Sequence, residues 1–153
     1  MRFASCVGFL VLAAAAAAAA QQPSKSPADS RACSLLTKED AAAALGEAVK
    51  GPDATAMPNG PSSCEYAGSG IHRVHLNLIP MTSAQATMYK AMCAKKSKDG
   101  LTGLGDTTCW YNEKHGELQV LKGTDFVSIE LRRNGDPTES IKGVARKVYE
   151  RMK

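Results

Sequence analysis

The stretch 108–133, TCWYNEKHGELQVLKGTDFVSIELRR, decides the fold because it predicts three consecutive strands joined by short turns. The segments TCWYNEK, ELQVLKG and FVSIELRR have the composition of strands, and HG and KGTD between them are typical of turns. In the third segment, Val127, Ile129 and Leu131 recur at every second position, so they should share one face of a sheet. We therefore expect an antiparallel meander here.

Two more strands are expected upstream, at 64–70 and 71–80, on either side of a Gly-Ser-Gly turn. In the second of them, Val74, Leu76 and Leu78 alternate with polar residues, which predicts a half-buried strand with a polar face. The segment before these strands, GPDATAMPNGPSS at 51–63, holds three prolines and two glycines and is predicted to be a loop.

Three helices complete the pattern. The first follows Thr37, a good N-cap, and ends at Gly46; the second spans 83–96. The third has Asp136 as its cap, Pro137 in its first turn and an apolar stripe made of Ile141, Val144, Ala145, Val148 and Met152. Its basic outer face would suit an anionic membrane, but we expect the stripe to cover the sheet.

The element order is thus α-β-β-α-β-β-β-α. It predicts an α+β fold with a mostly antiparallel sheet of about five strands and helices packed on it.

The expected helix 83–96 supplies candidates for ligand binding. One face carries, at i, i+1, i+4 and i+5 spacing, Met88, Tyr89, Met92 and Cys93. We expect the methionines to fill gaps in the core, the alternative being a pliable binding surface. Strand alternation should turn one of Trp110 and Tyr111 inward and the other outward. If an apolar ligand pocket exists, its expected lining is Met88, Met92 and Trp110.

Residues 1–20 have the features of a cleaved signal peptide. Arg2 precedes an apolar run that ends at Ala20, where small residues allow cleavage. A membrane anchor is the alternative, but much of the run is alanine and no basic residues follow it. Residues 21–31 are predicted to be a flexible leader and 32–153 a single domain. Cys33 lies too far beyond the run to carry a lipid, so we expect export to the periplasm or the extracellular space without a stable membrane anchor.

Four cysteines remain after such cleavage: Cys33, Cys64, Cys93 and Cys109. An even number in an exported chain predicts disulfides, and four cysteines allow three pairings. A cysteine-bearing helical segment followed by a cysteine-bearing strand occurs twice, which favours the local pairs Cys33–Cys64 and Cys93–Cys109.

Several common chemistries have no signal in the sequence. No C-x-x-C or C-x-x-C-H motif is present, which argues against a thioredoxin-type site, a zinc knuckle and covalent haem. His72 and His75 are three apart on a strand and should face opposite sides, while His115 falls in a turn, so no metal site is expected. No G-x-S-x-G motif and no dinucleotide fingerprint occurs, and we expect no catalytic residue and no cofactor. The dispersed basic residues do not suggest a nucleic-acid partner.

The stretches CSLLTKEDAAAALG at 33–46, CEY at 64–66 and GLGDTTCWY at 103–111 carry a family resemblance. They resemble bacterial secreted and lipoprotein domains of unknown function, which share a C-x-L-L-T helix start, a helix ending in L-G and a C-x-W/Y strand. The resemblance covers most of residues 32–132 and implies a small exported α+β domain, PsbP-like, with Cys33 and Cys64 as the matching cysteine pair. It implies no catalytic residues, and this chain adds Cys93 and Cys109.

The leading functional hypothesis is a non-catalytic binding or accessory module, exported and stabilised by disulfides. Its partner would be a small molecule or a protein of the cell envelope. A small secreted hydrolase, or a protein inhibitor or structural partner, is the alternative. A nucleophile, base and acid gathered in a concave pocket would favour the hydrolase, and a flat apolar patch would favour a protein partner.

Overall fold

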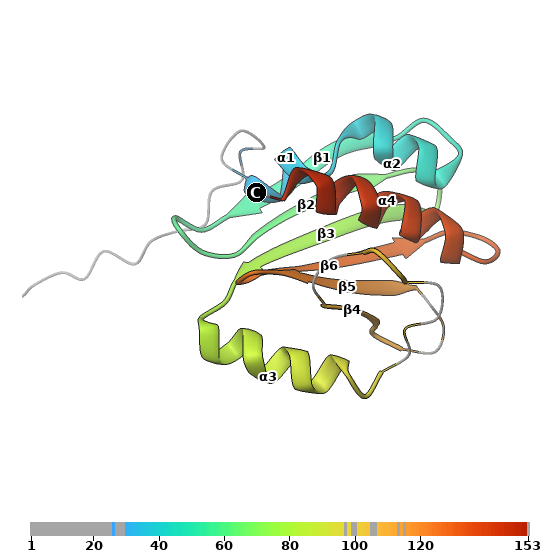
Figure 1. Cartoon of the computed structure of the whole chain (residues 1–153). Helices are drawn as coiled ribbons and strands as arrows, with labels where there is room; N and C mark the ends of the chain where they lie inside the picture. The colour runs from blue at the N-terminus through green and yellow to red at the C-terminus, as the bar shows by residue number, and fades with distance from the viewer. Residues whose placement is uncertain are drawn as a thin grey trace, which may run out of the picture.

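A six-stranded antiparallel sheet forms the middle of the molecule, with its strands in the order β1-β2-β3-β6-β5-β4 (Figure 1). The computed structural model describes residues 26, 30–96, 98, 101–104, 107–112, 114 and 116–152. The strands are β1 (Lys50–Ala56), β2 (Ser62–Ala67), β3 (Arg73–Pro80), β4 (Thr107–Trp110), β5 (Glu117–Lys122) and β6 (Asp125–Arg132). The helices within the described residues are α1 (Arg31–Leu35), α2 (Lys38–Leu45), α3 (Ser83–Cys93) and α4 (Thr138–Arg151).

The predicted α+β class with an antiparallel sheet is therefore confirmed. The number of strands and the element order were wrong in detail, because the sheet has a sixth strand and a short helix precedes α2.

The additional strand, β1, lies where the sequence predicts a loop. It is an edge strand that pairs with β2, and its register shifts between Lys50 and Asp53. Pro52 falls within this irregular start. An edge strand accepts a proline because one side of its backbone has no strand to pair with. The prolines of 51–63 therefore mark the irregular start of a strand and the turn after it, and they do not prevent the strand from forming.

One face of the sheet carries the main core and is covered by α1, α2 and α4. Val74, Leu76 and Leu78 of β3 point to this face and are buried, as their alternation predicts. The predicted apolar stripe of α4 is also buried, and its members are Ile141, Val144, Ala145, Val148 and Met152. Packing on the sheet thus uses the apolar face of α4, so this face is not free for a membrane surface.

The predicted helix ends are close to the observed ones. The backbone N–H of Asp40 donates to Thr37 Oγ1 (3.2 Å) and that of Thr37 donates to Asp40 Oδ2 (3.4 Å), which forms a capping box at α2. Gly46 ends α2 with a φ of 73°, in the left-handed region that favours glycine. α4 begins one residue later than expected, at Thr138, whose backbone N–H donates to Asp136 Oδ1 (2.9 Å).

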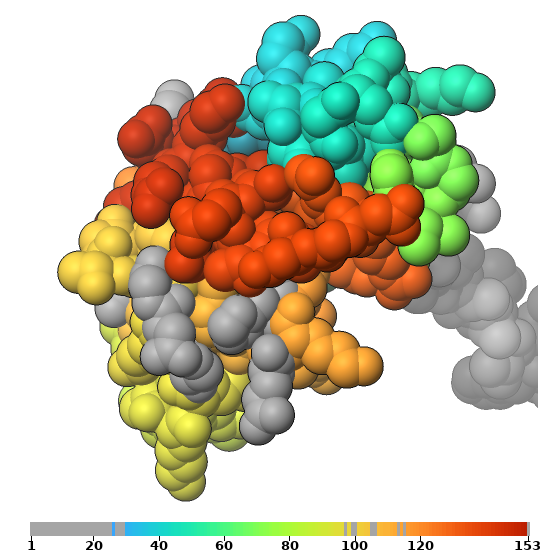
Figure 2. Space-filling model, turned by 90° about the vertical axis from the view of Figure 1, so that its right-hand side faces the viewer, coloured from blue at the N-terminus to red at the C-terminus, as the bar shows by residue number. Residues whose placement is uncertain are grey.

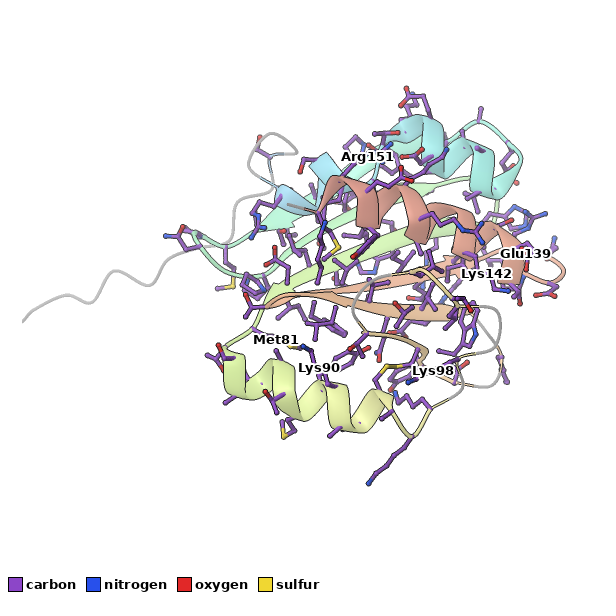
Figure 3. All side chains as sticks on the ribbon, viewed as in Figure 1. Met81, Lys90, Lys98, Glu139, Lys142 and Arg151 are labelled. Carbon is purple, nitrogen blue, oxygen red and sulfur yellow. A yellow bond between two sulfur atoms is a disulfide. The ribbon has the colours of Figure 1, made fainter. Side chains whose placement is uncertain are left out.

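Asp40 also ties α2 to α4. Its side chain is only 5% exposed, and Lys147 Nζ lies 2.9 Å from Oδ1. Arg151, labelled in Figure 3, donates from Nη1 to Asp40 Oδ2 and to the carbonyl oxygen of Leu35, the latter at 2.8 Å. Burial raises the pKa of Asp40, but the hydrogen bonds from Arg151 and Lys147 outweigh it and hold the pKa well below its ordinary value. Asp40 is therefore an anion held between two cations of α4.

The remaining helix, α3, packs on the opposite face of the sheet. In Figure 1 it lies beside β4, away from the other three helices. A second cluster of buried residues holds it there, formed by Ala86, Tyr89, Cys93, Cys109, Leu121 and Phe126. The rings of Tyr89 and Phe126 meet edge to face with centroids 4.9 Å apart. α3 thus covers only the β4–β5–β6 end of this face.

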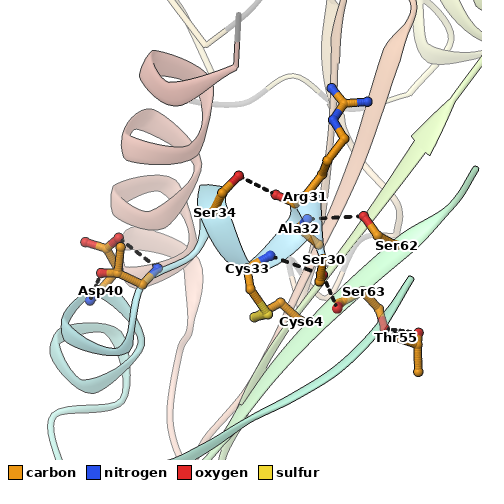
Figure 4. The surroundings of a disulfide bond; sticks show 11 residues. Ser30, Arg31, Ala32, Cys33, Ser34, Asp40, Thr55, Ser62, Ser63 and Cys64 are labelled. Carbon is orange, nitrogen blue, oxygen red and sulfur yellow. Dashed lines mark hydrogen bonds between the residues drawn. A yellow bond between two sulfur atoms is a disulfide. The ribbon is translucent and has the colours of Figure 1, made fainter. Parts of the chain in front are cut away.

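Each of the two disulfides joins a helix to a strand. Cys33–Cys64 joins α1 to β2, and Cys93–Cys109 joins the last residue of α3 to β4. Both are the local pairs that the sequence favours. Cys33 lies inside α1, a separate turn of helix, rather than in the chain that leads to α2 (Figure 4).

The folded domain begins before the expected residue 32. Ser30 Oγ donates to the carbonyl oxygen of Ser63 (2.8 Å), and Arg31 forms an ion pair with Asp125 (2.7 Å). Both residues lie in the segment 21–31, for which the sequence predicts a flexible leader. The expected signal peptide at 1–20 lies outside the described residues. Within the described part of the chain, no helix is both long enough and apolar enough to cross a membrane.

Candidate functional site

Most of the second face of the sheet, across β1, β2, β3 and β6, has no described helix packed on it. We call this surface the open face. Its outward side chains, given by strand alternation, are Thr55, Ser63, Glu65, His75, Asn77, Ile79, Ser128 and Glu130. All of them are half-buried or exposed.

The side chains of the open face form two rows that run across the strands. Cross-strand register places small polar side chains in the first row, in the order Thr55, Ser63, Asn77 and Ser128. The second row contains a histidine between two acids, in the order Glu65, His75 and Glu130. Side chains directly opposite each other on neighbouring strands are close enough to interact, so each row is a continuous polar strip.

Many polar groups of these rows already have partners within the protein. Thr55 Oγ1 and Ser63 Oγ are 2.7 Å apart, and Ser128 Oγ donates to Glu117 Oε1 (2.6 Å). The acids of the second row lie beside arginines, in the pairs Glu65–Arg73 and Glu130–Arg132. These bonds fix the edges of the two rows.

The centre of the open face is different. His75 and Asn77 are half-buried, two residues apart on β3, and neither side chain has a hydrogen-bond partner among the described residues. An imidazole and a carboxamide together offer both donors and acceptors. Their hydrogen-bonding capacity is therefore available to a molecule that lies across β3.

A shallow apolar hollow adjoins Asn77. It has a volume of about 260 Å³, and its lining is Thr55, Met57, Pro61, Ser62, Ser63, Asn77 and Ile79. Met57 is 45% and Ile79 36% exposed, and both side chains line this hollow. The hollow and the free polar groups share Asn77, so they form one continuous site.

A serine, a histidine and a glutamate meet elsewhere, at the end of the sheet. Glu47 Oε1 lies 2.6 Å from His72 Nδ1, and Ser69 Oγ donates to Glu47 Oε2 (2.7 Å). The backbone N–H of Asn134 donates to His72 Nε2 (3.3 Å), so Nδ1 carries the proton that Glu47 accepts. Figure 2 shows the segments involved side by side, with the α2–β1 loop in cyan, the β2–β3 turn in green and the start of α4 in orange-red.

This group has the residue types of a hydrolytic triad but not its connections. A serine nucleophile must give its proton to the imidazole, whereas Ser69 donates to the carboxylate and both ring nitrogens of His72 are occupied. Hydrogen bonds from the side chain and backbone of Ser69, and from His72, lower the pKa of Glu47 to about 2. The arrangement joins three loops through the ionised carboxylate of Glu47. Among the described residues of this group, neither ring nitrogen of His72 is free to act as the base for Ser69.

The structure does not bring Met88, Met92 and Trp110 together. Met88 and Met92 are 63% and 51% exposed on the outer side of α3, where they line a shallow surface with Ala91, Lys95 and Lys96. Trp110 is buried in the main core, while its neighbour Tyr111 is exposed, as alternation predicts. The expectation that the methionines fill the core was wrong, because Tyr89 and Cys93 occupy the buried side of α3.

Replacing both exposed methionines by serine (M88S/M92S) should change the free energy of unfolding by no more than about 0.5 kcal/mol, because their side chains face solvent. Tyr89→Ala, on the buried side of the same helix, should cost about 3 kcal/mol or more. Urea denaturation of the three proteins measures both values. A loss in M88S/M92S as large as that in Tyr89→Ala would place the methionines in the core after all.

The described residues contain no cluster of three or more histidine, cysteine or acidic side chains suited to a metal ion. His72 lies in the β2–β3 turn with Glu47, His75 lies on the open face, and His115 is outside the described residues. His72 and His75, which were expected to face opposite sides of one strand, therefore lie in different parts of the structure.

The resemblance to bacterial secreted and lipoprotein domains rests on the stretches 33–46, 64–66 and 103–111. It remains a prediction, because comparison of the chain with protein-family models, with curated proteins and with solved structures gives no match.

Proposed function

We propose that this protein is an exported, non-catalytic binding module whose open face holds a segment of a polypeptide partner. The observation that carries the proposal is the pair of free polar side chains, His75 and Asn77, beside the exposed apolar hollow of Met57 and Ile79. Polar groups that fix orientation next to an apolar anchor point are the usual composition of a recognition site.

The size of the hollow favours a polypeptide over an enclosed small molecule. Sites that enclose small ligands usually measure about 300–1,000 Å³ and bury most of the ligand. A shallow hollow of about 260 Å³ would instead accept one apolar side chain of a partner. The free side chains of His75 and Asn77 beside it would then hydrogen-bond the backbone of the same segment.

Export is supported by the two disulfides, which are typical of proteins outside the reducing cytoplasm. The sequence of residues 1–20 and the family resemblance point the same way. A protein inhibitor or structural partner would use the same surface, so identification of the bound protein decides between these roles and an accessory one.

A photo-crosslinking amino acid at position 77 tests the proposal in cells that export the protein. We expect one discrete adduct whose added mass, measured by intact mass spectrometry, is that of a polypeptide. The same amino acid at Arg146, which is exposed on α4, is the control and should give none. A second control, Ile79→Asp combined with the probe at 77, should reduce the adduct because it places a charge beside the hollow.

Two results would contradict the proposal. Equal crosslinking from positions 77 and 146 would mean that the open face has no preference for a partner. An added mass of only a few hundred daltons would identify a small-molecule ligand.

A further inference from the structure

The solvent side of α3 carries a second apolar stripe, opposite the one that packs on the sheet. The buried side of the helix is formed by Ala86, Tyr89 and Cys93. The residues of the other stripe recur at i, i+4, i+7 and i+8, and we call them the outer stripe: Ala84, Met88, Ala91 and Met92. Its two methionines are 63% and 51% exposed. Packing on the sheet accounts for the buried side only, so the outer stripe is an exposed apolar surface.

Positive charge lies at the C-terminal end of the outer stripe. Lys95 continues the spacing of the stripe, and together with Lys96 it lines the same shallow surface as the two methionines. Residues 83–96, all of which the structure describes, contain three lysines and no aspartate or glutamate. The outer side of α3 is therefore apolar along the helix and basic at its end.

An exposed aromatic ring lies beside these lysines. Tyr111, directly after β4, is 53% exposed, and Lys96 Nζ lies 4.7 Å from the centroid of its ring. The same ammonium group donates to the carbonyl oxygen of Tyr111 (3.4 Å). Tyrosine and lysine are both suited to the headgroup level of a bilayer, because each has an apolar body and a polar end that stays in water.

We propose that the outer stripe of α3 rests on an anionic lipid bilayer, with its two methionines at the acyl boundary and Lys95 and Lys96 among the lipid phosphates. A reversible contact of this kind needs apolar side chains next to basic ones and no segment that crosses the membrane. Figures 1 and 2 show α3 at one extremity of the molecule, where a flat surface can reach it. This surface is separate from the open face, and the proposal does not rest on the function proposed for that face.

The dimensions of α3 favour a bilayer over a protein partner. A helix of 11 residues is about 16 Å long and about 10 Å wide, so its outer side covers about 160 Å². A stable protein interface needs about 800 Å² from each partner. A fluid bilayer has no such requirement, because each inserted side chain is buried separately. A second copy of this chain, paired through the same stripe, would place lysines against lysines.

Co-sedimentation with vesicles tests the contact on protein purified from cells that export it. The wild type should bind phosphatidylglycerol vesicles at least about tenfold more tightly than phosphatidylcholine vesicles, since each lysine near an anionic surface contributes to binding. M88S/M92S should bind phosphatidylglycerol vesicles about tenfold more weakly than the wild type, because two apolar side chains no longer enter the bilayer. Its fold should be intact, because both side chains face solvent. Met57→Ser, at an exposed methionine beside the open face, is the matched control and should bind as the wild type does.

The charges are tested by a second pair of variants. K95Q/K96Q should bind phosphatidylglycerol vesicles about tenfold more weakly than the wild type, because two positive charges next to the phosphates are lost. Binding of the wild type should also weaken as the NaCl concentration rises, since salt screens this attraction. K38Q/K50Q removes the same charge at exposed positions on α2 and β1 and should bind as the wild type does.

Oxidation of the methionines shows which surface meets the bilayer. Peroxide converts exposed methionine thioethers to sulfoxides, and peptide mass spectrometry measures the rate at each position. Bound phosphatidylglycerol vesicles should slow the oxidation of Met88 and Met92 severalfold. Met57, which is exposed beside the open face, should be oxidised at the same rate with and without vesicles.

Several results would overturn the proposal. It is wrong if the wild type does not bind phosphatidylglycerol vesicles, if it binds both lipids equally, or if M88S/M92S binds as tightly as the wild type. A photo-crosslinking amino acid at position 92 covers the remaining case in cells that export the protein. A discrete polypeptide adduct there, without vesicle binding, would assign the outer stripe to a protein partner instead of a bilayer.

Discussion

Replacing Cys33 and Cys64 together by alanine should lower the free energy of unfolding by about 3–4 kcal/mol, because this disulfide closes a long loop in the unfolded chain. The bond spans 31 residues and holds α1 on β2. Two hydrogen bonds support the same contact, from Ser30 Oγ to the carbonyl oxygen of Ser63 (2.8 Å) and from the N–H of Ala32 to Ser62 Oγ (3.1 Å; Figure 4). Urea denaturation under non-reducing conditions measures the loss.

The second disulfide is the matched control for this prediction. Cys93–Cys109 spans only 16 residues, so C93A/C109A should lose about 3 kcal/mol, slightly less than the first pair. In the presence of a reductant, neither disulfide remains in any of the proteins, so each double variant should be about as stable as the reduced wild type. A loss below about 1 kcal/mol for C33A/C64A would mean that the contacts of α1, rather than the crosslink, hold this end of the domain.

The variant Asp40→Asn should lose about 2–4 kcal/mol at neutral pH, because it removes the buried anion between Lys147 and Arg151 and keeps the size of the side chain. The two cations are themselves 51% and 35% exposed, so water can reach them in the variant and limit the loss. Thermal or urea unfolding at pH 7 measures it.

The pH dependence of this loss separates charge from packing. The pKa of Asp40 is lower in the folded than in the unfolded protein, where it is near 3.8, so its contribution is complete at neutral pH. As the pH falls below about 4, the unfolded state takes up the proton first and the contribution of Asp40 declines. The difference between the wild type and Asp40→Asn should therefore shrink below pH 4.

Glu39 supplies the matched control for Asp40. It is exposed in the same first turn of α2 and has no ion pair among the described residues. Glu39→Gln should change stability by less than about 0.5 kcal/mol. A loss in Asp40→Asn that stays constant down to pH 3 would show that packing of the side chain, not its charge, connects α2 to α4.

Local signals in the sequence predicted the elements that obey them. The alternation of Val74, Leu76 and Leu78, the cap at Thr37 and the glycine at position 46 all have the expected structural roles. β1 was not predicted, because proline and glycine argue only against a central strand. The sequence does not show which strand lies at the edge of the sheet. The methionines of α3 were misplaced because they lie one position before Tyr89 and Cys93, about 100° around the helix.

The candidate site could be predicted only in part. The polar face of β3, with His75 and Asn77, is visible in the sequence as the alternate positions of a half-buried strand. Which strands lie beside β3, and which helices cover each face, depends on long-range packing that no local pattern encodes. The hollow beside Met57 therefore could not be predicted from the sequence, because it forms where β1, β2 and β3 meet.

The strand order has a consequence for how the chain assembles. The pairing of β3 with β6 joins two meanders, β1-β2-β3 and β4-β5-β6, that are each continuous in the chain. Cys33–Cys64 lies within the first meander and its helices, and Cys93–Cys109 lies within the second. Oxidation therefore closes a loop within each half, and among the described residues no disulfide crosses the junction between them. We expect the two halves to unfold as one unit only because the β3–β6 seam, and α4 packed across both halves, couple them.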